Sequence, residues 1–450
     1  MGAAADKLTS LATDPERYDF PAHELRAVQI EAIDERLHEK ADAIKVVKFR
    51  ADEAQIGSVS ELADAVKLLL PHTAYKSYPE SFLVKERWDR LTKWLSTVSA
   101  YPTDDIDLTG VDNIDDWVEA CAKAGKYVSC SSGTTGKSAM LVSSQADLDF
   151  ASRDGVVAVE WGSEISKGDN RVSAGAASAV AYTPRNTAMG KGLMGAFVDP
   201  DAPRFDSGLP PLTVGSLMGL VKLRKAIADG SADPSEVAAF EAESAKRQKA
   251  LDDAQDRAVD DIISKREERL YITGMWGALY EFAERVRAKG YGAKDFHPEN
   301  GVYLGGGLKR AQLPDNYREY VYETFNLQPR YIYQMYGMQE LNTSMPRCQE
   351  GGRYHLAPWL VPLILDKTGE NLLPIEDGEY EGRAAFFDLS LDGRWGGVIS
   401  GDKVSIDFSP CKCGARSPSI RDNITRYADP EGDDKIGCAG TVDAYVRGIA

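Results

Sequence analysis

The chain has 450 residues, with 53 Lys and Arg against 70 Asp and Glu, so its formal net charge at pH 7 is −17. That excess of negative charge argues against a nucleic-acid backbone or an anionic membrane surface as a partner. No apolar run approaches the roughly 18 residues of a membrane span, and the first residues lack the basic-then-apolar order of a secretory signal. With 43% hydrophobic residues, the composition predicts a soluble, cytoplasmic globular protein.

Two helices are predicted early in the chain. Residues 58–70 favour one, entered through Ser58 or Ser60 and ended by Pro71. Residues 21–50 favour the other, because their apolar side chains recur mostly three or four positions apart, as on one face of a helix. That stripe consists of Leu25, Val28, Ala32, Ile33 and Leu37. We therefore expect a helical lead-in over residues 1–100.

The rest of the chain alternates helical segments with short apolar runs. Residues 127–180 mix apolar runs with Gly and Ser, which indicates strands and turns. Residues 233–290 are the most helical stretch: a charged, exposed excursion at about 232–270 is followed by an amphipathic part that ends at Gly290. Short strands are predicted at 302–304, 331–333, 360–365, 384–387 and 397–399. Helices interleaved with short strands predict an α/β fold with more than one sheet.

The segment of residues 131–138 is rich in small and hydroxyl side chains and carries one lysine, a composition that suits an anion. It reads Ser131-Ser132-Gly133-Thr134-Thr135-Gly136-Lys137-Ser138. A P-loop match fails, because its first glycine would fall at Ser131 and because residues 139–144 read as a strand, whereas a P-loop opens into a helix. A helix is expected to start near Ser144, with Asp147 as its capping partner. A plain turn that happens to carry a lysine is the alternative.

This octet resembles the phosphate loop of the AMP-forming, adenylate-forming superfamily, which contains acyl-CoA ligases, luciferases and peptide-synthetase adenylation domains. In that family the loop cradles the phosphates of ATP. The resemblance implies that the nucleotide contacts here include Ser131, Ser132, Gly133, Thr134, Thr135, Gly136 and Lys137.

Four further blocks resemble motifs of the same superfamily, in the expected order. The first two are Gly305-Gly306-Gly307-Leu308-Lys309, which would lie along the adenine and the acyl substrate, and Tyr336-Gly337-Met338-Gln339-Glu340. In the second, the resemblance implies that Tyr336 stacks beside adenine and that Glu340 holds Mg²⁺, an ion that prefers oxygen ligands. The last two are Ser400-Gly401-Asp402, whose aspartate would accept hydrogen bonds from the ribose hydroxyls, and the hinge residues Ile424-Thr425-Arg426. Gln339 and Thr425 depart from the family pattern, which has Thr or Ser and Gly there.

Three of the six cysteines combine with one histidine into a metal-ligand pattern. Cys348 and His355 are separated by six residues, and Cys411 and Cys413 by one, within Cys-Lys-Cys-Gly. The set has the Cys₃His composition of a structural, tetrahedral zinc site. Its spacing resembles that of phenylacetate-CoA ligase relatives. Unliganded buried cysteines and redox chemistry are the alternatives.

The resemblance implies a multi-subdomain adenylation domain over residues 1–425, with mixed sheets packed by helices. Residues 426–450 would form the hinge and a short tail. Because 24 residues follow Arg426, the small C-terminal domain that the family usually carries is expected to be absent. We consider a homodimer as the assembly.

The function implied by the resemblance is ATP-dependent activation of a carboxylic acid to an acyl-adenylate, followed by transfer to a thiol, with coenzyme A (CoA) as the default acceptor. Lys137 and Mg²⁺-bound Glu340 would be the catalytic groups, and the acid is expected to be aryl or apolar. One alternative hands the acyl group to an amine or, as in acyl-protein synthetases, to a cysteine of a protein. Cys438 is the candidate, provided that Lys435 or Arg447 lowers its pKa. The other alternative is a catalytically silent nucleotide-binding relative.

Overall fold

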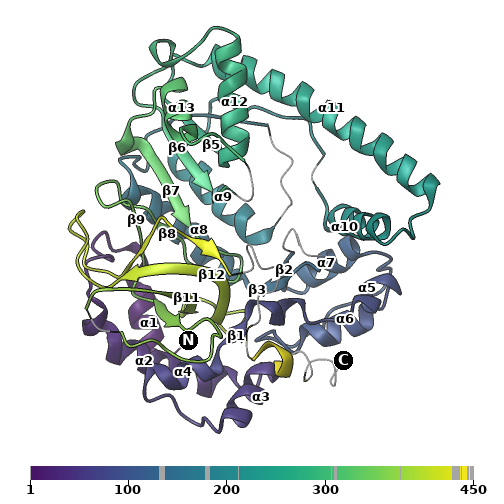
Figure 1. Cartoon of the computed structure of the whole chain (residues 1–450), viewed down its shortest axis with the longest axis vertical. Helices are drawn as coiled ribbons and strands as arrows, with labels where there is room; N and C mark the ends of the chain where they lie inside the picture. Colours follow the sequence, from purple (N-terminus) through teal and green to yellow (C-terminus); the bar gives the residue numbers. More distant parts are fainter. Residues whose placement is uncertain are drawn as a thin grey trace.

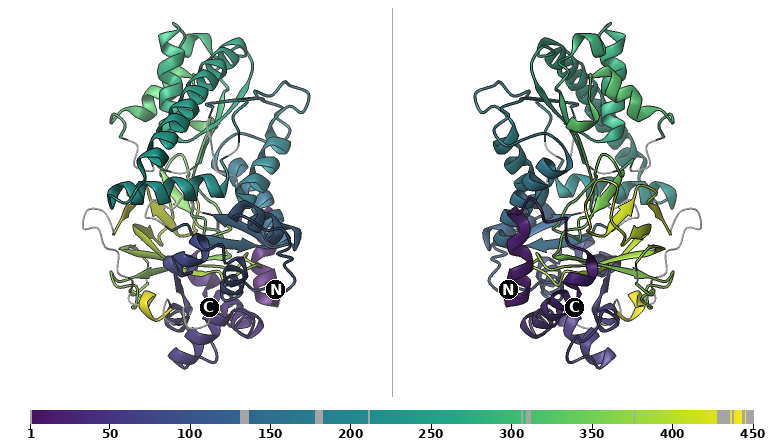
Figure 2. Two further views of the ribbon diagram at one scale, coloured as in Figure 1. Left: turned by 90° about the vertical axis from the view of Figure 1, so that its right-hand side faces the viewer. Right: turned by 90° about the vertical axis from the view of Figure 1, so that its left-hand side faces the viewer.

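The computed structural model describes residues 2–130, 137–177, 183–210, 212–305, 307–308, 312–375, 377–427, 436, 438–442 and 445. The chain forms an α/β architecture with two large sheets and a two-stranded hairpin. In the side views the N-terminal helices lie at one end of the molecule and α11 and α12 at the other (Figure 2). Among the described residues, no helix combines the length and apolarity needed to cross a membrane.

The first large sheet has five strands in the order β4-β5-β6-β7-β8. Four are parallel and β8 is antiparallel to β7. Their bounds are β4 Val172–Gly175, β5 Leu270–Gly274, β6 Gly301–Gly305, β7 Ile332–Tyr336 and β8 Met345–Pro346.

Successive side chains of a strand point to opposite faces of the sheet, so both faces here are apolar. Helices cover each of them. Ile272 and Ile332 pack on one face against α11 (Pro234–Ser264), α12 (Trp276–Ala288) and α13 (Tyr317–Thr324). Tyr271 and Tyr333 pack on the other face against α8 (Gln145–Gly162) and α9 (Pro184–Phe197).

The second large sheet follows the order β10-β11-β12-β13-β9, and β1 and β14 also pair with β12. Its strands are β1 Leu70–Pro71, β9 Arg353–His355, β10 Leu360–Leu365, β11 Glu379–Asp388, β12 Gly397–Asp407, β13 Ser419–Arg421 and β14 Thr425–Arg426. One face, including Val361 and Phe387, packs into a core that it shares with the N-terminal helices. These are α1 Ala3–Thr9, α2 Ala22–Lys40, α3 Lys45–Ala54, α4 Leu62–Leu68, α5 Glu80–Val84, α6 Trp88–Leu95 and α7 Ile114–Lys123.

The hairpin consists of β2 (Tyr127–Cys130) and β3 (Met140–Ser143), which pair in antiparallel register. The predicted strand after the glycine-rich segment is thus confirmed, and a P-loop is excluded. The capping of the next helix is also as predicted: the Ser144 side chain accepts from the Asp147 backbone N–H, and Asp147 accepts from the Ser144 N–H in return.

The two helices predicted early in the chain have different bounds in the structure. Residues 41–44 separate α2 from α3, so residues 21–50 are not one helix. The helix predicted at 58–70 is α4, which Glu61 caps in place of a serine. Leu70 and Pro71 pair with Val398 and Ile399 of β12.

The stretch 233–290 was predicted to be the most helical part of the chain, but it also contains β5, the second strand of the first large sheet. The helix of the charged excursion is present as α11 (Figure 1). It ends at Ser264, and Ala258 and Ile262 in its C-terminal half are buried in a core rather than exposed. The remaining elements are α10 (Val214–Ala228) and four short 3₁₀ helices at Ser10–Thr13, His72–Lys76, Ala293–Asp295 and Pro329–Tyr331.

A buried ion pair connects the N-terminal segment to α8. Arg17 Nη1 lies 2.9 Å from Asp154 Oδ1, and both side chains are fully buried. Arg17 also donates to the Tyr18 hydroxyl and to the Ala12 carbonyl, while Asp154 Oδ2 accepts from the Ser344 N–H. A buried charge is tolerated only where such partners replace water.

We predict that Asp154→Ala lowers the free energy of unfolding by about 3–5 kcal/mol, because it leaves the Arg17 guanidinium buried without its counter-charge. Urea denaturation measures this. Asp149→Ala is the control, since Asp149 is exposed on the same helix; its effect should stay below about 0.5 kcal/mol. Equal losses in the two variants would contradict this reading of the ion pair.

Candidate active site

Tyr336, Asp402 and Arg426 come together where the two large sheets meet. Tyr336 ends β7 of one sheet, and Asp402 lies in β12 of the other. The Tyr336 hydroxyl donates to Asp402 Oδ2 at 2.7 Å, and Arg426 Nε lies 3.2 Å from Asp402 Oδ1. Arg426 is opposite Asp402 in the β12–β14 register. Three residues predicted for nucleotide binding thus form one contact network.

The electrostatics of this network keep Tyr336 protonated. Burial raises the pKa of Tyr336 well above its ordinary value, and the adjacent Asp402 carboxylate raises it further. The phenol is therefore a hydrogen-bond donor at neutral pH, while the Asp402 carboxylate remains an acceptor with lone pairs to spare.

Glu340 lies within the segment of residues 339–344, which a buried arginine holds in place. Arg394 Nη2 donates to the carbonyl oxygens of Gln339 and Glu340, and its Nη1 donates to the Val142 carbonyl on β3. Among the described residues, no hydrogen bond or ion pair engages the Glu340 carboxylate. That carboxylate is close enough to raise the pKa of Tyr336, although burial is the main cause of the rise.

Buried aspartates fix the rest of the 339–344 segment. Asp388 Oδ2 accepts from the backbone N–H groups of Asn342 and Thr343 at 2.7 and 2.9 Å. Asn342 Nδ2 donates to the Asp147 carbonyl, and the Asp147 carboxylate accepts from the Gly393 N–H. The segment that carries Glu340 is therefore bound to α8, to β3 and to the loop that precedes β12.

Lys137 directly follows the glycine-rich segment, of which Ser131, Ser132, Gly133, Thr134, Thr135 and Gly136 lie outside the described residues. The Lys137 ammonium donates to the Tyr78 carbonyl at 2.7 Å and to the Lys76 carbonyl at 3.4 Å. It also lies 5.4 Å from the centre of the Tyr78 ring. The Tyr78 hydroxyl donates to the Ser138 carbonyl. The helical lead-in thus supports the one lysine of this loop.

Gly305 ends β6 opposite Met335 of β7. Gly307 lies two residues beyond, and Gly306 is outside the described residues. Gly337 follows Tyr336 in the chain. A Cβ at position 337 would lie 2.8 Å from the Met335 side chain. Met338 packs against the core of the second large sheet.

The predicted metal ligands meet at the edge of the second large sheet. The candidate ligand atoms of Cys348, His355, Cys411 and Cys413 all lie within 4.8 Å of one another. The sheet explains how the distant halves meet: Ser419, just beyond the Cys-Lys-Cys turn, pairs with His355 between β13 and β9. The structure therefore brings together the whole predicted Cys₃His set.

The surroundings fit a metal ion. His355 Nδ1 lies 3.0 Å from Ser417 Oγ, which leaves Nε2 facing the thiols, 3.5 Å from Cys413 Sγ. A Cβ at Gly351 would collide with Cys411 Sγ, so a glycine is needed beside the cluster. With four protein ligands, such a site is closed and structural in type.

The described surroundings of Cys438 do not favour its thiolate. Burial raises the pKa of its thiol, and Arg50 offsets only part of that rise. A nucleophilic thiolate needs the opposite shift. Lys435 and Arg447, the residues considered for lowering this pKa, lie outside the described residues, so the role of Cys438 as an acyl acceptor stays a hypothesis.

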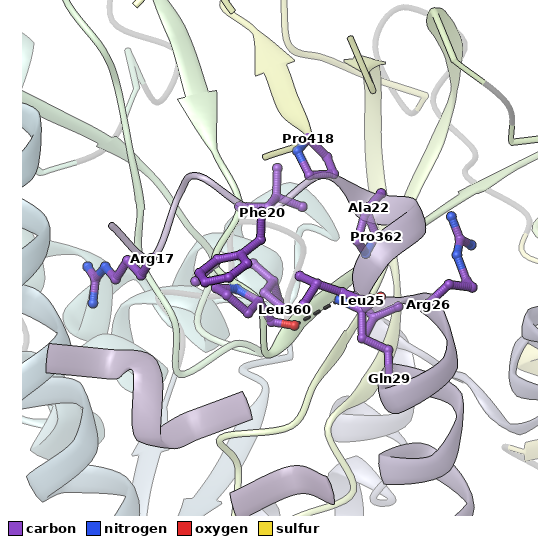
Figure 3. A pocket seen from close by; sticks show the side chains of 13 residues that line it. Arg17, Phe20, Ala22, Leu25, Arg26, Gln29, Leu360, Pro362 and Pro418 are labelled. Carbon is purple, nitrogen blue, oxygen red and sulfur yellow. Dashed lines mark hydrogen bonds between the residues drawn. The ribbon is translucent and has the colours of Figure 1, made fainter. Parts of the chain in front are cut away.

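A pocket between α2 and β10 lies apart from these groups (Figure 3). It is lined by Phe20, Leu25 and Leu360 among others, and none of the predicted site residues contributes to it. Gln29 and Pro358 also line it, and Gln29 Nε2 donates to the Pro358 carbonyl at 2.8 Å.

The sequence interpretation missed Arg394, Asp388 and Arg185, which position the 339–344 segment. Arg185, near the start of α9, donates to the Asn342 carbonyl at 2.8 Å. Arg394 has one sequence signal, its place in an Asp-Gly-Arg-Trp-Gly-Gly run just before β12. Arg185 has none.

No protein-family model and no curated protein sequence matches the chain. The solved structures that resemble it include two of 2-hydroxyisobutyryl-CoA ligase in complex with 2-HIB-AMP and CoA. An open conformation has a TM-score of 0.55 at 12% identity and covers 92% of this chain and 72% of that one. The thioesterification state has a TM-score of 0.56 at 13% identity and covers 92% of this chain and 71% of that one. These likenesses confirm the predicted α/β fold with more than one sheet.

We predict that protein purified without added metal carries about one zinc ion per chain, because four ligand atoms converge. Cys411→Ser should reduce the zinc content and lower the unfolding temperature, since metal binding stabilises the folded state. Elemental analysis and thermal denaturation test this. Cys121→Ser changes a buried cysteine outside the cluster and should leave the zinc content unaltered. Metal-free protein, or equal zinc loss in both variants, would refute the assignment.

Proposed function

We propose that the chain activates a carboxylic acid with ATP, forming an acyl-adenylate and pyrophosphate, and transfers the acyl group to a thiol, with CoA as the default acceptor. The shared fold supports this, since the neighbouring ligase structures hold 2-HIB-AMP and CoA. We further propose one adenylation domain over residues 1–425 and a cytoplasmic location.

The observation that carries the proposal is the contact between Tyr336, Asp402 and Arg426. An aromatic ring beside a buried carboxylate suits a nucleoside, whose base stacks on the ring while its ribose hydroxyls donate to the carboxylate. Arg426 holds the second carboxylate oxygen and adds positive charge beside the place proposed for the ribose.

The first half-reaction needs charge stabilisation rather than covalent help from the protein. A substrate carboxylate oxygen attacks the α-phosphorus, the bond to the bridging oxygen breaks, and pyrophosphate leaves with the electron pair. Lys137, held by the carbonyls of Tyr78 and Lys76, is the proposed cation for the phosphates. The acid is held in line with the α-phosphorus, so much of the acceleration would come from positioning.

Glu340 fits the proposed role of a Mg²⁺ ligand. Its carboxylate is uncommitted among the described residues, while Arg394 fixes its backbone. When bound, Mg²⁺ would neutralise charge on the phosphates. The contribution of this chain is the Glu340 carboxylate, which it holds near Tyr336 as an oxygen ligand for the ion.

The second half-reaction transfers the acyl group. The thiol sulfur attacks the acyl carbon, the bond to the phosphate oxygen breaks, AMP leaves, and the thiol proton is lost to solvent or base. We propose that the Cys₃His cluster holds Zn²⁺ only as a structural ion. The acyl body would lie against Tyr303, Tyr333 and Met335, which favour an aryl or apolar chain.

We predict acid-dependent exchange of radiolabel between pyrophosphate and ATP, measured over a panel of carboxylic acids. Asp402→Asn should raise the KM for ATP, because an amide replaces one acceptor oxygen with a donor. Lys137→Ala and Glu340→Ala should each slow exchange by at least about 100-fold, because each removes charge stabilisation.

Lys403→Ala is the matched control for Lys137→Ala. Lys403 is a partly exposed residue beside Asp402 in β12, and it pairs with Glu381. This variant should exchange at nearly the wild-type rate. Near-normal exchange in Lys137→Ala or Glu340→Ala would refute the assigned roles, and the absence of exchange with every acid would refute the proposed function.

A further inference from the structure

The first turn of α9 is buried in the protein. Thr183 is its N-cap residue and Arg185 its second helical residue, and they are 6% and 5% exposed. Met189 lies one turn beyond Arg185 on the same helix face, and its sulfur is 3.8 Å from the Tyr303 hydroxyl. Arg185 is therefore on the face of α9 that is turned toward Tyr303, the strand residue that precedes the glycine turn at Gly305.

Most of the hydrogen-bonding capacity of Arg185 is unused. A guanidinium has five N–H donors. Among the described residues, Arg185 makes one hydrogen bond, from Nη2 to the Asn342 carbonyl, and its buried Nε has no acceptor. It also has no ion-pair partner in that part of the chain.

The nearest buried acids are committed elsewhere. Burial lowers the pKa of Arg185; of the ionisable groups that act on it, Tyr303, Asp154 and Asp388 raise the pKa and Arg394 lowers it. Asp154 is bound to Arg17 and to the Ser344 N–H. Asp388 is bound to the segment that contains Asn342. Arg185 and Arg394 thus lie in a buried region where the carboxylates already accept hydrogen bonds from other donors.

Two further polar atoms here lack partners. Thr183 Oγ1 makes no capping hydrogen bond, and both it and Asn342 Oδ1 are buried without a partner among the described residues. Buried polar atoms are nearly always hydrogen-bonded in folded proteins. The positive end of the α9 dipole adds to the charge of Arg185. Arg185 and Thr183 thus bring positive charge and unused donors to the start of α9, whereas Asn342 Oδ1 is an unpaired acceptor.

From this we infer that Arg185, Thr183 and the N-terminus of α9 form a subsite for a carboxylate of the acid substrate. The inference rests on the proposed function, because it assigns the ligand to the acid. A guanidinium binds a planar carboxylate through two parallel hydrogen bonds, and a threonine hydroxyl adds a third donor. The position beside Tyr303 and Met189 favours the acyl side over the nucleotide side, where Tyr336 and Asp402 lie.

The bound carboxylate has two sources. It is either the reacting carboxylate of a monocarboxylic acid or the second carboxylate of a dicarboxylic acid. Matched pairs such as butyrate with succinate and benzoate with terephthalate distinguish them. If Arg185→Gln weakens both members of a pair, the subsite holds the reacting group. If it weakens only the diacid, the subsite holds the second group.

The test is calorimetric binding of these four acids to the full chain without ATP, compared between wild type and Arg185→Gln. We expect affinity to fall about 10- to 100-fold in the variant, as for loss of hydrogen bonds to a charged group. Arg185→Lys should recover part of the affinity, because it keeps the charge. Arg153→Gln, at an exposed position on α8, should bind like wild type. Thr183→Val provides a second variant should Arg185→Gln fail to fold.

Binding without ATP separates this inference from the proposed function. Wild-type protein that binds none of the four acids, or Arg185→Gln protein that binds them unchanged, overturns the subsite. A variant that binds acids normally but has a raised KM for ATP also overturns it, since Arg185 would then serve a phosphate. Failure of pyrophosphate exchange despite Arg185-dependent acid binding overturns the proposed function alone.

Discussion

The candidate site depends on charges buried around the 339–344 segment. Asp388 accepts from two consecutive backbone N–H groups of this segment, and Arg394 donates to two consecutive carbonyls. Each charge loses hydration on burial and regains stability only through several well-directed hydrogen bonds, so the segment has little freedom to move without leaving one unpaired. Glu340, near the start of this segment, is therefore held rigidly, as catalysis by positioning requires.

The two large sheets are joined at the same place. β6 and β7 end at the glycine turn and at Tyr336, and ligands of open α/β sheets bind outside such carboxyl ends. Asp402 reaches Tyr336 from β12 of the other sheet. The metal cluster lies at an edge of the second large sheet that is hydrogen-bonded to the first. Tyr354, next to His355, accepts from Gln334 of β7 and donates to Asp422. A structural ion there would stabilise the junction without touching the substrate.

Much of the site could be predicted because its residues belong to short motifs whose residue types and spacing indicate nucleotide or metal binding. Tyr336, Asp402 and Arg426 were expected from the resemblance to superfamily motifs in their order, and the structure joins them through Asp402. The Cys₃His set was expected from its ligand types and spacing, and the structure brings the four residues together. Strand β5 was missed because Leu270–Gly274 is a short apolar run between two helices, and periodicity cannot distinguish such a run from helix. Arg185 and Arg394 were missed because nothing local in a sequence indicates that an arginine will be buried, which depends on tertiary packing.

The central claim is that ATP is cleaved between its α- and β-phosphates by a carboxylic acid. The most direct measurement is mass spectrometry of the nucleotide products after wild-type protein, ATP, Mg²⁺ and an acid panel are incubated with and without CoA. The account predicts acid-dependent pyrophosphate and an acyl-adenylate, with AMP and an acyl thioester accumulating once CoA is present. Formation of ADP and phosphate, or ATP turnover indifferent to every acid, would contradict it.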